Sequence, residues 1–144
     1  MNDQLFLESA RSRFAGQKAL GDKTLAQLEG NGLHWKPNDS CNSIAQIVKH
    51  LHGNMLSRWT NFLTEDGEKE WRQRDAEFES GNETAEEILE LWESGWAVLL
   101  ETLDGLSAAD LGRTVTIRTE PLSVTDAIVR QLTHYSYHVG QIVF

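Results

Sequence analysis

The repeat of apolar residues between Thr84 and Leu103 constrains the fold of this chain more than any other feature. Apolar side chains recur there at steps of three and four: Ala85, Ile88, Trp92, Trp96, Leu99 and Leu103. This spacing places all of them on one face of an α-helix. Thr84 and Glu87 stand at the spacing of a capping box, which marks the start of such a helix. An apolar helix face must be buried, so the segment predicts packing of helix against helix.

Three further segments show helical patterns. The first runs from about Asp3 to about Glu29 and stops at glycines. The second begins at Asn42 or Ser43, again with capping-box spacing, and the third begins near Ser123 and continues to the end of the chain. Their apolar positions are Leu7, Ala10, Phe14, Gly21, Leu25 and Leu28; Ile44, Ile47, Leu51, Met55, Trp59 and Phe62; and Val124, Ile128, Leu132, Tyr135, Val139 and Ile142. The predicted fold class is all-α, a four-helix bundle that forms one domain over residues 1–144.

Two segments between these helices lack a helical pattern. Thr64–Asn82 contains two glycines and many charges, and it predicts a long connection. Connections of that length are uncommon unless they carry local structure or function. Leu111–Leu122 alternates and is rich in β-branched residues, which predicts a short strand or hairpin before the last helix.

Composition limits the classes of function and the compartment. The net charge of −9 argues against binding to nucleic acid, because phosphate contacts need clustered Lys and Arg. Apolar runs such as Trp96–Leu100 are too short to cross a bilayer, and we expect no membrane association. The first 20 residues carry charges throughout and show no secretory signal. Cys41 is the single cysteine, so an internal disulfide is ruled out and a cytoplasmic location is expected.

His134 and His138 indicate a metal site. They are four residues apart in a predicted helix, so both imidazoles lie on one helix face and can reach one point in space. Gln131 and Gln141 lie near them. Two neutral imidazoles placed in this way form half of a transition-metal site.

A third histidine on the helix that starts near Ser43 would complete the site. His50 lies on one flank of the apolar stripe and His52 on the other, and periodicity does not choose between them. Asn54 and Arg58 continue the row of His50. Three imidazoles would leave coordination positions open for water or substrate. Candidate substrate contacts are Asn54, Arg58 and Arg130, the two arginines for an anionic group; no catalytic residue is identified, and no carboxylate is seen beside the histidines.

Two motifs resemble the DinB-like superfamily, which includes bacillithiol transferases and mycothiol-dependent maleylpyruvate isomerase. They are Ser43–Leu51, which reads Ser-Ile-Ala-Gln-Ile-Val-Lys-His-Leu, and His134–Ile142, which reads His-Tyr-Ser-Tyr-His-Val-Gly-Gln-Ile. The resemblance runs from about residue 4 to the end of the chain and is closest to an uncharacterised bacterial branch. It implies a helical bundle with His50, His134 and His138 as metal ligands, and it gives His52 no role.

The resemblance also suggests an activity. We expect a metal-dependent enzyme of the thiol S-transferase type, with zinc as the first choice of metal and nickel as the second. The expected partners are a small-molecule substrate, including a low-molecular-weight thiol, and a second copy of the chain in a homodimer. The alternatives are a metal-dependent hydrolase and a non-catalytic metal-binding protein of the stress response. The lack of a carboxylate beside the histidines counts against the hydrolase.

Overall fold

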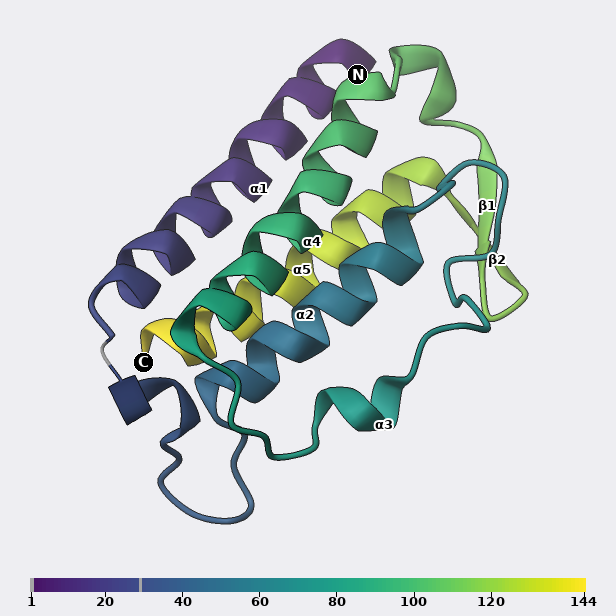
Figure 1. Ribbon diagram of the computed structural model, residues 1–144. Coiled ribbons are helices and arrows are strands. Elements are labelled where there is room, and N and C mark those ends of the chain that lie inside the picture. The colour runs from purple at the N-terminus through teal and green to yellow at the C-terminus, as the bar shows by residue number, and fades with distance from the viewer. Residues whose placement is uncertain (1, 29) are drawn as a thin grey trace.

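Four long helices form the bundle: α1 (Asp3–Ala26), α2 (Ile44–Trp59), α4 (Ala85–Gly105) and α5 (Val124–Val143) (Figure 1). The computed structural model describes residues 2–28 and 30–144. In it, α1 and α2 each pack against both α4 and α5. The shorter elements are α3 (Arg74–Glu77), the strands β1 (Thr114–Ile117) and β2 (Glu120–Ser123), and 3₁₀ helices at Gly30–His34 and Ala108–Asp110. The predicted all-α class is confirmed, and so is the hairpin before the last helix.

The predicted helix starts are confirmed by side-chain caps. Ser43 Oγ accepts a hydrogen bond from the Gln46 N–H, and Gln46 Oε1 accepts one from the Ser43 N–H. Thr84 and Glu87 make the same reciprocal pair at the start of α4. These bonds satisfy amides that a helix leaves unpaired at its first turn, and they fix where each helix begins. The helix α1 ends at Ala26; its predicted end, Glu29, lies outside the described residues.

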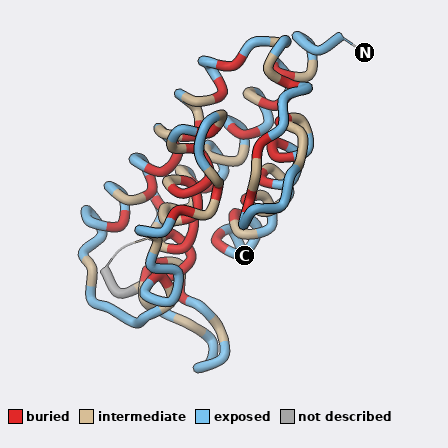
Figure 2. Tube along the Cα trace, turned by 90° about the vertical axis from the view of Figure 1, so that its right-hand side faces the viewer, coloured by how far each residue is buried: buried red, intermediate tan, exposed pale blue. Residues whose placement is uncertain are grey.

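Large aromatic side chains fill the centre of the bundle. Phe14, Trp59, Trp92, Trp96 and Tyr135 are almost completely buried and come from all four long helices. Figure 2 shows buried residues on the inward faces of the helices and exposed residues on the outward faces. No helix in the described part of the chain is both long and apolar enough to span a membrane.

The close packing of α1 against α4 gives a test of this core. A Cβ at Gly21 would collide with the Trp92 indole, which is buried and donates a hydrogen bond to Asp22. We expect Gly21→Ala to destabilise the protein by about 1–3 kcal/mol, because overpacking forces side chains from their preferred positions. Gly16→Ala, on the same helix, is the control: apart from its chain neighbours and its own helix backbone, no described atom would lie within 4 Å of the added Cβ. It should stabilise the protein by about 0.5–1 kcal/mol. Urea unfolding measures both changes, and equal stability of the two variants would contradict the packing.

The helices α2 and α4 run in the same direction, so the chain must return along the bundle between them (Figure 1). The return segment runs beside α2 and contains α3, a four-residue helix that is too short to show a periodic pattern. Ser57 Oγ and Lys69 tie the segment to α2 through hydrogen bonds. The Gly67 N–H donates to Thr116 O of β1. The long connection is thus an ordered segment, held by hydrogen bonds to α2 and β1, rather than a loose loop.

Asp66 joins the hairpin to this connection. Its carboxylate accepts hydrogen bonds from the N–H groups of Glu68, Arg118 and Thr119. Burial alone would raise the pKa of Asp66, but these bonds outweigh it, and the pKa lies well below its usual range. Arg118 and Thr119 have positive φ angles of 52° and 67°, as a two-residue hairpin turn that follows the sheet twist requires.

Candidate metal centre

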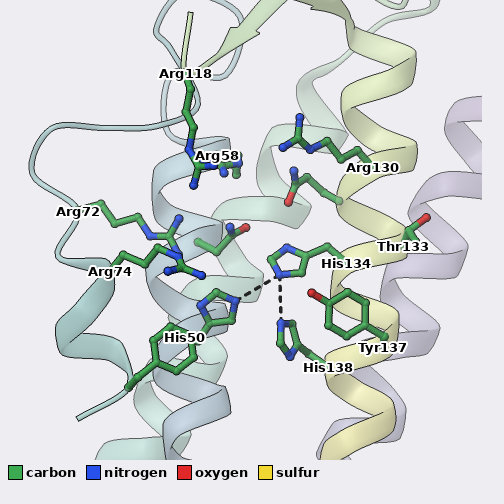
Figure 3. A pocket seen from close by; sticks show the side chains of 13 residues that line it. His50, Arg58, Arg72, Arg74, Arg118, Arg130, Thr133, His134, Tyr137 and His138 are labelled. Atoms are coloured by element: carbon green, nitrogen blue, oxygen red, sulfur yellow. Dashed lines mark hydrogen bonds between the residues drawn. The ribbon is translucent and has the colours of Figure 1, made fainter. Parts of the chain in front are cut away.

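His50 of α2 and His134 and His138 of α5 come together at one side of the bundle (Figure 3). His134 Nε2 lies 3.3 Å from His50 Nε2 and 3.1 Å from His138 Nε2. His50 is buried, and the other two are half-buried. The three side chains thus offer one nitrogen each to a common point at the edge of the core.

A buried chain of hydrogen bonds holds α2 and α5 in register at this point. Trp59 Nε1 donates to Tyr135 Oη at 3.1 Å, and the Tyr135 hydroxyl donates to Asn54 Oδ1 at 2.7 Å. Tyr135 directly follows His134, and Asn54 is one turn after His50. The same contacts that build the core therefore set the distance between the histidines.

The outer nitrogens of two histidines have fixed acceptors. His50 Nδ1 lies 3.0 Å from Glu77 Oε1, and His138 Nδ1 lies 2.7 Å from Gln141 Oε1. Both acceptors are oxygens, so each Nδ1 carries a proton, and in the neutral form of the ring this leaves the lone pair at Nε2. Metal-ligating histidines usually have such an acceptor on the other ring nitrogen.

The geometry of the three Nε2 atoms fits a cation. The lone pairs of His50 and His138 both approach His134 Nε2, which can donate one proton to only one of them. At least one pair of nitrogens then meets without a proton between them, and a bound cation would remove this repulsion. A tetrahedral zinc with Zn–N bonds of about 2.0–2.1 Å places its ligand nitrogens about 3.3–3.4 Å apart. Two of the three separations lie close to that value, and all three ligand atoms lie within 4.8 Å of one another, so the residues present fit a divalent metal.

His134 and His138 are kept in the neutral form that binds metals. Burial, together with the nearby His138 and His50, lowers the pKa of His134 to about 3. Burial also lowers the pKa of His138, in spite of its hydrogen bond to Gln141. At neutral pH no proton therefore competes with a cation at these two rings.

Glu77 corrects the interpretation that no carboxylate lies beside the histidines. It comes from α3, in the connection, and it is buried with Arg72 Nε and Nη2 each 2.9 Å from one of its oxygens. Burial alone would raise the pKa of Glu77, but hydrogen bonds from His50 and Arg72 outweigh it, so the pKa is lowered. The sequence does not predict this contact, because Glu77 is 27 residues from His50 and belongs to no periodic pattern. The unusual length of the connection was the only sign that this segment carries structure or function.

The other predicted residues fall in different places. His52 does not join the cluster, and its backbone lies against Gly95 of α4. The choice that periodicity left open is thus decided in favour of His50. Asn54, Arg58 and Arg130 all line the pocket beside the histidines. Asn54 Oδ1 is already engaged by Tyr135, and Arg58 pairs with Glu68, whereas Arg130 shows no such contact among the described residues.

The pocket has a volume of about 410 Å³, which is within the range of small-molecule sites. Its floor is formed by the three histidines, and its walls come from α2, the connection, the hairpin and α5. The sequence did not single out the wall residues Arg72, Arg74, Phe78, Arg118, Thr133 and Tyr137. Most of these lie in the irregular segments, where no periodicity predicts a direction for a side chain.

Comparison with known proteins gives a family but no activity. A family model described as "Protein of unknown function (DUF1572)" matches residues 2–144. No curated protein matches the chain.

Proposed function

We propose that this chain, which belongs to the DUF1572 family, is a metal-dependent enzyme of the thiol S-transferase type. The observation that carries the proposal is the convergence of three histidines on the floor of an open pocket. Zinc is the metal that we favour, with nickel as the alternative, since both accept imidazole ligands. The substrate is a small molecule, and the second substrate is a low-molecular-weight thiol.

The resemblance to the DinB-like superfamily supports this choice of chemistry. The two motifs that carry the resemblance contain all three histidines of the cluster and also Gln141, which accepts from His138. Thiol transfer is the reaction of the bacillithiol transferases in that superfamily. A divalent cation in this place would act as a Lewis acid and favour the thiolate form of a thiol.

The side chains of the chain have separate tasks in this proposal. His50, His134 and His138 hold the cation, while Glu77 and Gln141 fix the orientation of two of the rings. The pocket leaves space for a thiol and an electrophile next to the histidines. Burial of the histidines on one side and the ordered connection on the other exclude part of the solvent from this space.

Hydrolysis is the weaker alternative. A hydrolase needs a base that can take a proton from water, usually a free carboxylate or histidine. None of the described side chains that line the pocket is acidic. Glu77, the nearest carboxylate, is turned to His50 and Arg72 behind the histidines and is already fully engaged.

A transfer assay with matched variants tests the proposal. Protein loaded with one equivalent of zinc is mixed with an activated aryl halide and each of a panel of small thiols. We expect a thiol-dependent rate that exceeds the rates of zinc alone and of metal-free protein. The rate should be lost in His138→Ala and kept in His52→Ala, because only His138 belongs to the cluster. If no thiol gives such a rate while ester or phosphoester panels are turned over without thiol, transfer is wrong and hydrolysis is supported.

A further inference from the structure

We infer that the substrate of this pocket carries a carboxylate or phosphate group, which binds between Arg74 and Arg130. The inference rests on the proposed function, because it names the class of small molecule that would lie beside the histidines. It depends on the distribution of charge around the pocket, on the pairing of each arginine, and on two buried polar atoms.

Positive charge is concentrated at this pocket in a chain that is acidic as a whole. The net charge is −9, yet five of the eight arginines line this one pocket. They are Arg58, Arg72, Arg74, Arg118 and Arg130. Because these arginines are clustered, the pocket has a positive local potential that attracts anions, although the chain as a whole is negatively charged.

Three of these arginines already have carboxylate partners. Arg72 forms a two-pronged pair with Glu77, and Arg58, Arg72 and Arg118 all lie within ion-pair distance of Glu68. Two carboxylates thus face five guanidinium groups, which leaves an excess of three positive charges. The three paired arginines build the wall of the pocket and retain one of the excess charges, and the remaining two arginines carry the other two.

Arg74 and Arg130 have no carboxylate within ion-pair distance in the part of the chain that the structure describes. The Arg74 guanidinium lies 5.4 Å from the centre of the Phe78 ring, and that ring packs on His50. Arg130 is four residues before His134, on the same face of α5. In Figure 3 the two side chains come from opposite walls, on either side of the histidines. An anionic group held by both would therefore lie next to the metal ligands.

Two polar atoms in side chains of the pocket lining are buried without a hydrogen-bond partner in the described part of the chain. Arg58 Nε and Gln131 Oε1 have no hydrogen-bond partner among the described residues. Both side chains are more than nine-tenths buried and line the pocket. A buried donor and a buried acceptor without partners are costly, so a ligand that satisfies both would bind favourably. An oxyanion accepts from the donor, and a hydroxyl or amine on the same molecule donates to the acceptor.

Guanidinium geometry decides the kind of anion. The planar fork of N–H groups matches the paired oxygens of a carboxylate or a phosphate, and such contacts are stronger than neutral hydrogen bonds. The volume of about 410 Å³ admits a small molecule and excludes a folded polymer.

Binding of simple anions to metal-free protein tests the inference. Inorganic phosphate and succinate are titrated separately, with amide NMR shifts and calorimetry as readouts. The double variant Arg74→Gln/Arg130→Gln is compared with Arg13→Gln/Arg113→Gln, which removes the same charge from exposed arginines outside the pocket. We expect the pocket variant to weaken binding by about tenfold or more, because each lost guanidinium removes a charge-assisted contact. The control variant should bind as the wild type does. Tighter binding of phosphate or of succinate identifies which anion the site prefers.

Zinc retention separates this inference from the proposed function, and it is measured on separate aliquots of the wild type and both double variants after loading with one equivalent of zinc and desalting. If the protein retains zinc but both double variants bind the anions equally well, the anion site alone is overturned. The same holds if the protein retains zinc and binds no anion at all. Anion binding that depends on Arg74 and Arg130 without zinc retention would support the anion site and overturn the metal centre. Both arginines are exposed and lie outside the core, so the variants are expected to fold.

Discussion

Replacement of His134 by alanine is expected to weaken zinc binding by more than about 100-fold, since even the loss of an outer partner of a metal ligand costs 10–100-fold. His134 is the central member of the cluster, with its Nε2 close to the Nε2 atoms of both other histidines. Without it, His50 and His138 remain on separate helices with no ligand between them. Competition with a chromophoric chelator measures the change in affinity.

His52→Ala is the matched control for this prediction. His52 lies on the same helix as His50 and is half-buried, but it is not part of the cluster. It should therefore retain the zinc affinity of the wild type. The melting temperature of metal-free His134→Ala should be no lower than that of the metal-free wild type. The substitution removes a ring nitrogen that lies close to the Nε2 atoms of His50 and His138 and is repelled by at least one of them. Zinc affinity within tenfold of the wild type in His134→Ala would contradict the assigned ligand set.

Replacement of Glu77 by alanine is expected to destabilise the fold by about 3–5 kcal/mol, the usual cost of removing one partner of a buried ion pair. The Arg72 side chain is 2% exposed and the Glu77 side chain 8% exposed, so Arg72 would be left charged and buried without its main partner. His50 would also lose the acceptor at Nδ1. Urea unfolding of the metal-free protein measures the loss of stability.

The effect of Glu77 on the metal is tested with a milder variant. Glu77→Gln keeps an oxygen that accepts from His50, but it removes the charge that faces Arg72. Loss of an outer partner of a metal ligand usually lowers metal affinity by about 10–100-fold. We expect Glu77→Gln to lower zinc affinity by about 10-fold and Glu77→Ala to lower it by about 100-fold. Glu79→Ala removes an exposed carboxylate two residues further on and should change neither property. Wild-type stability and zinc affinity in Glu77→Ala would show that the carboxylate has no supporting role.

Much of the bundle follows from local signals in the sequence. The two capping boxes at Ser43 and Thr84 act over three residues, and their partners are found where the spacing predicts. The pair His134 and His138 is equally local, because helix geometry alone brings residues i and i+4 together. The choice of His50 over His52 is not local, since it depends on how α2 is rotated against α5. The motif resemblance supplied that choice before the structure did.

The wall of the pocket could not be predicted in the same way. Glu77, Arg72 and Arg74 lie in a connection without periodicity, and their positions depend on contacts with α2 and the hairpin. Those contacts include Lys69 with Ser57, and Gly67 with Thr116, which are distant in sequence. No local pattern encodes such contacts, so the charge of the pocket emerges only when the chain is folded. The unusual length of the connection did, however, correctly indicate that this segment carries local structure.

Anomalous diffraction at the zinc edge, from crystals of protein loaded with one equivalent of zinc, tests the central claim most directly. We predict one strong peak, about 2.0–2.1 Å from the Nε2 atoms of His50, His134 and His138, with the side toward the pocket free of protein ligands. No peak at these nitrogens, or a peak at other residues, would contradict a three-histidine metal centre and remove the basis for the proposed chemistry.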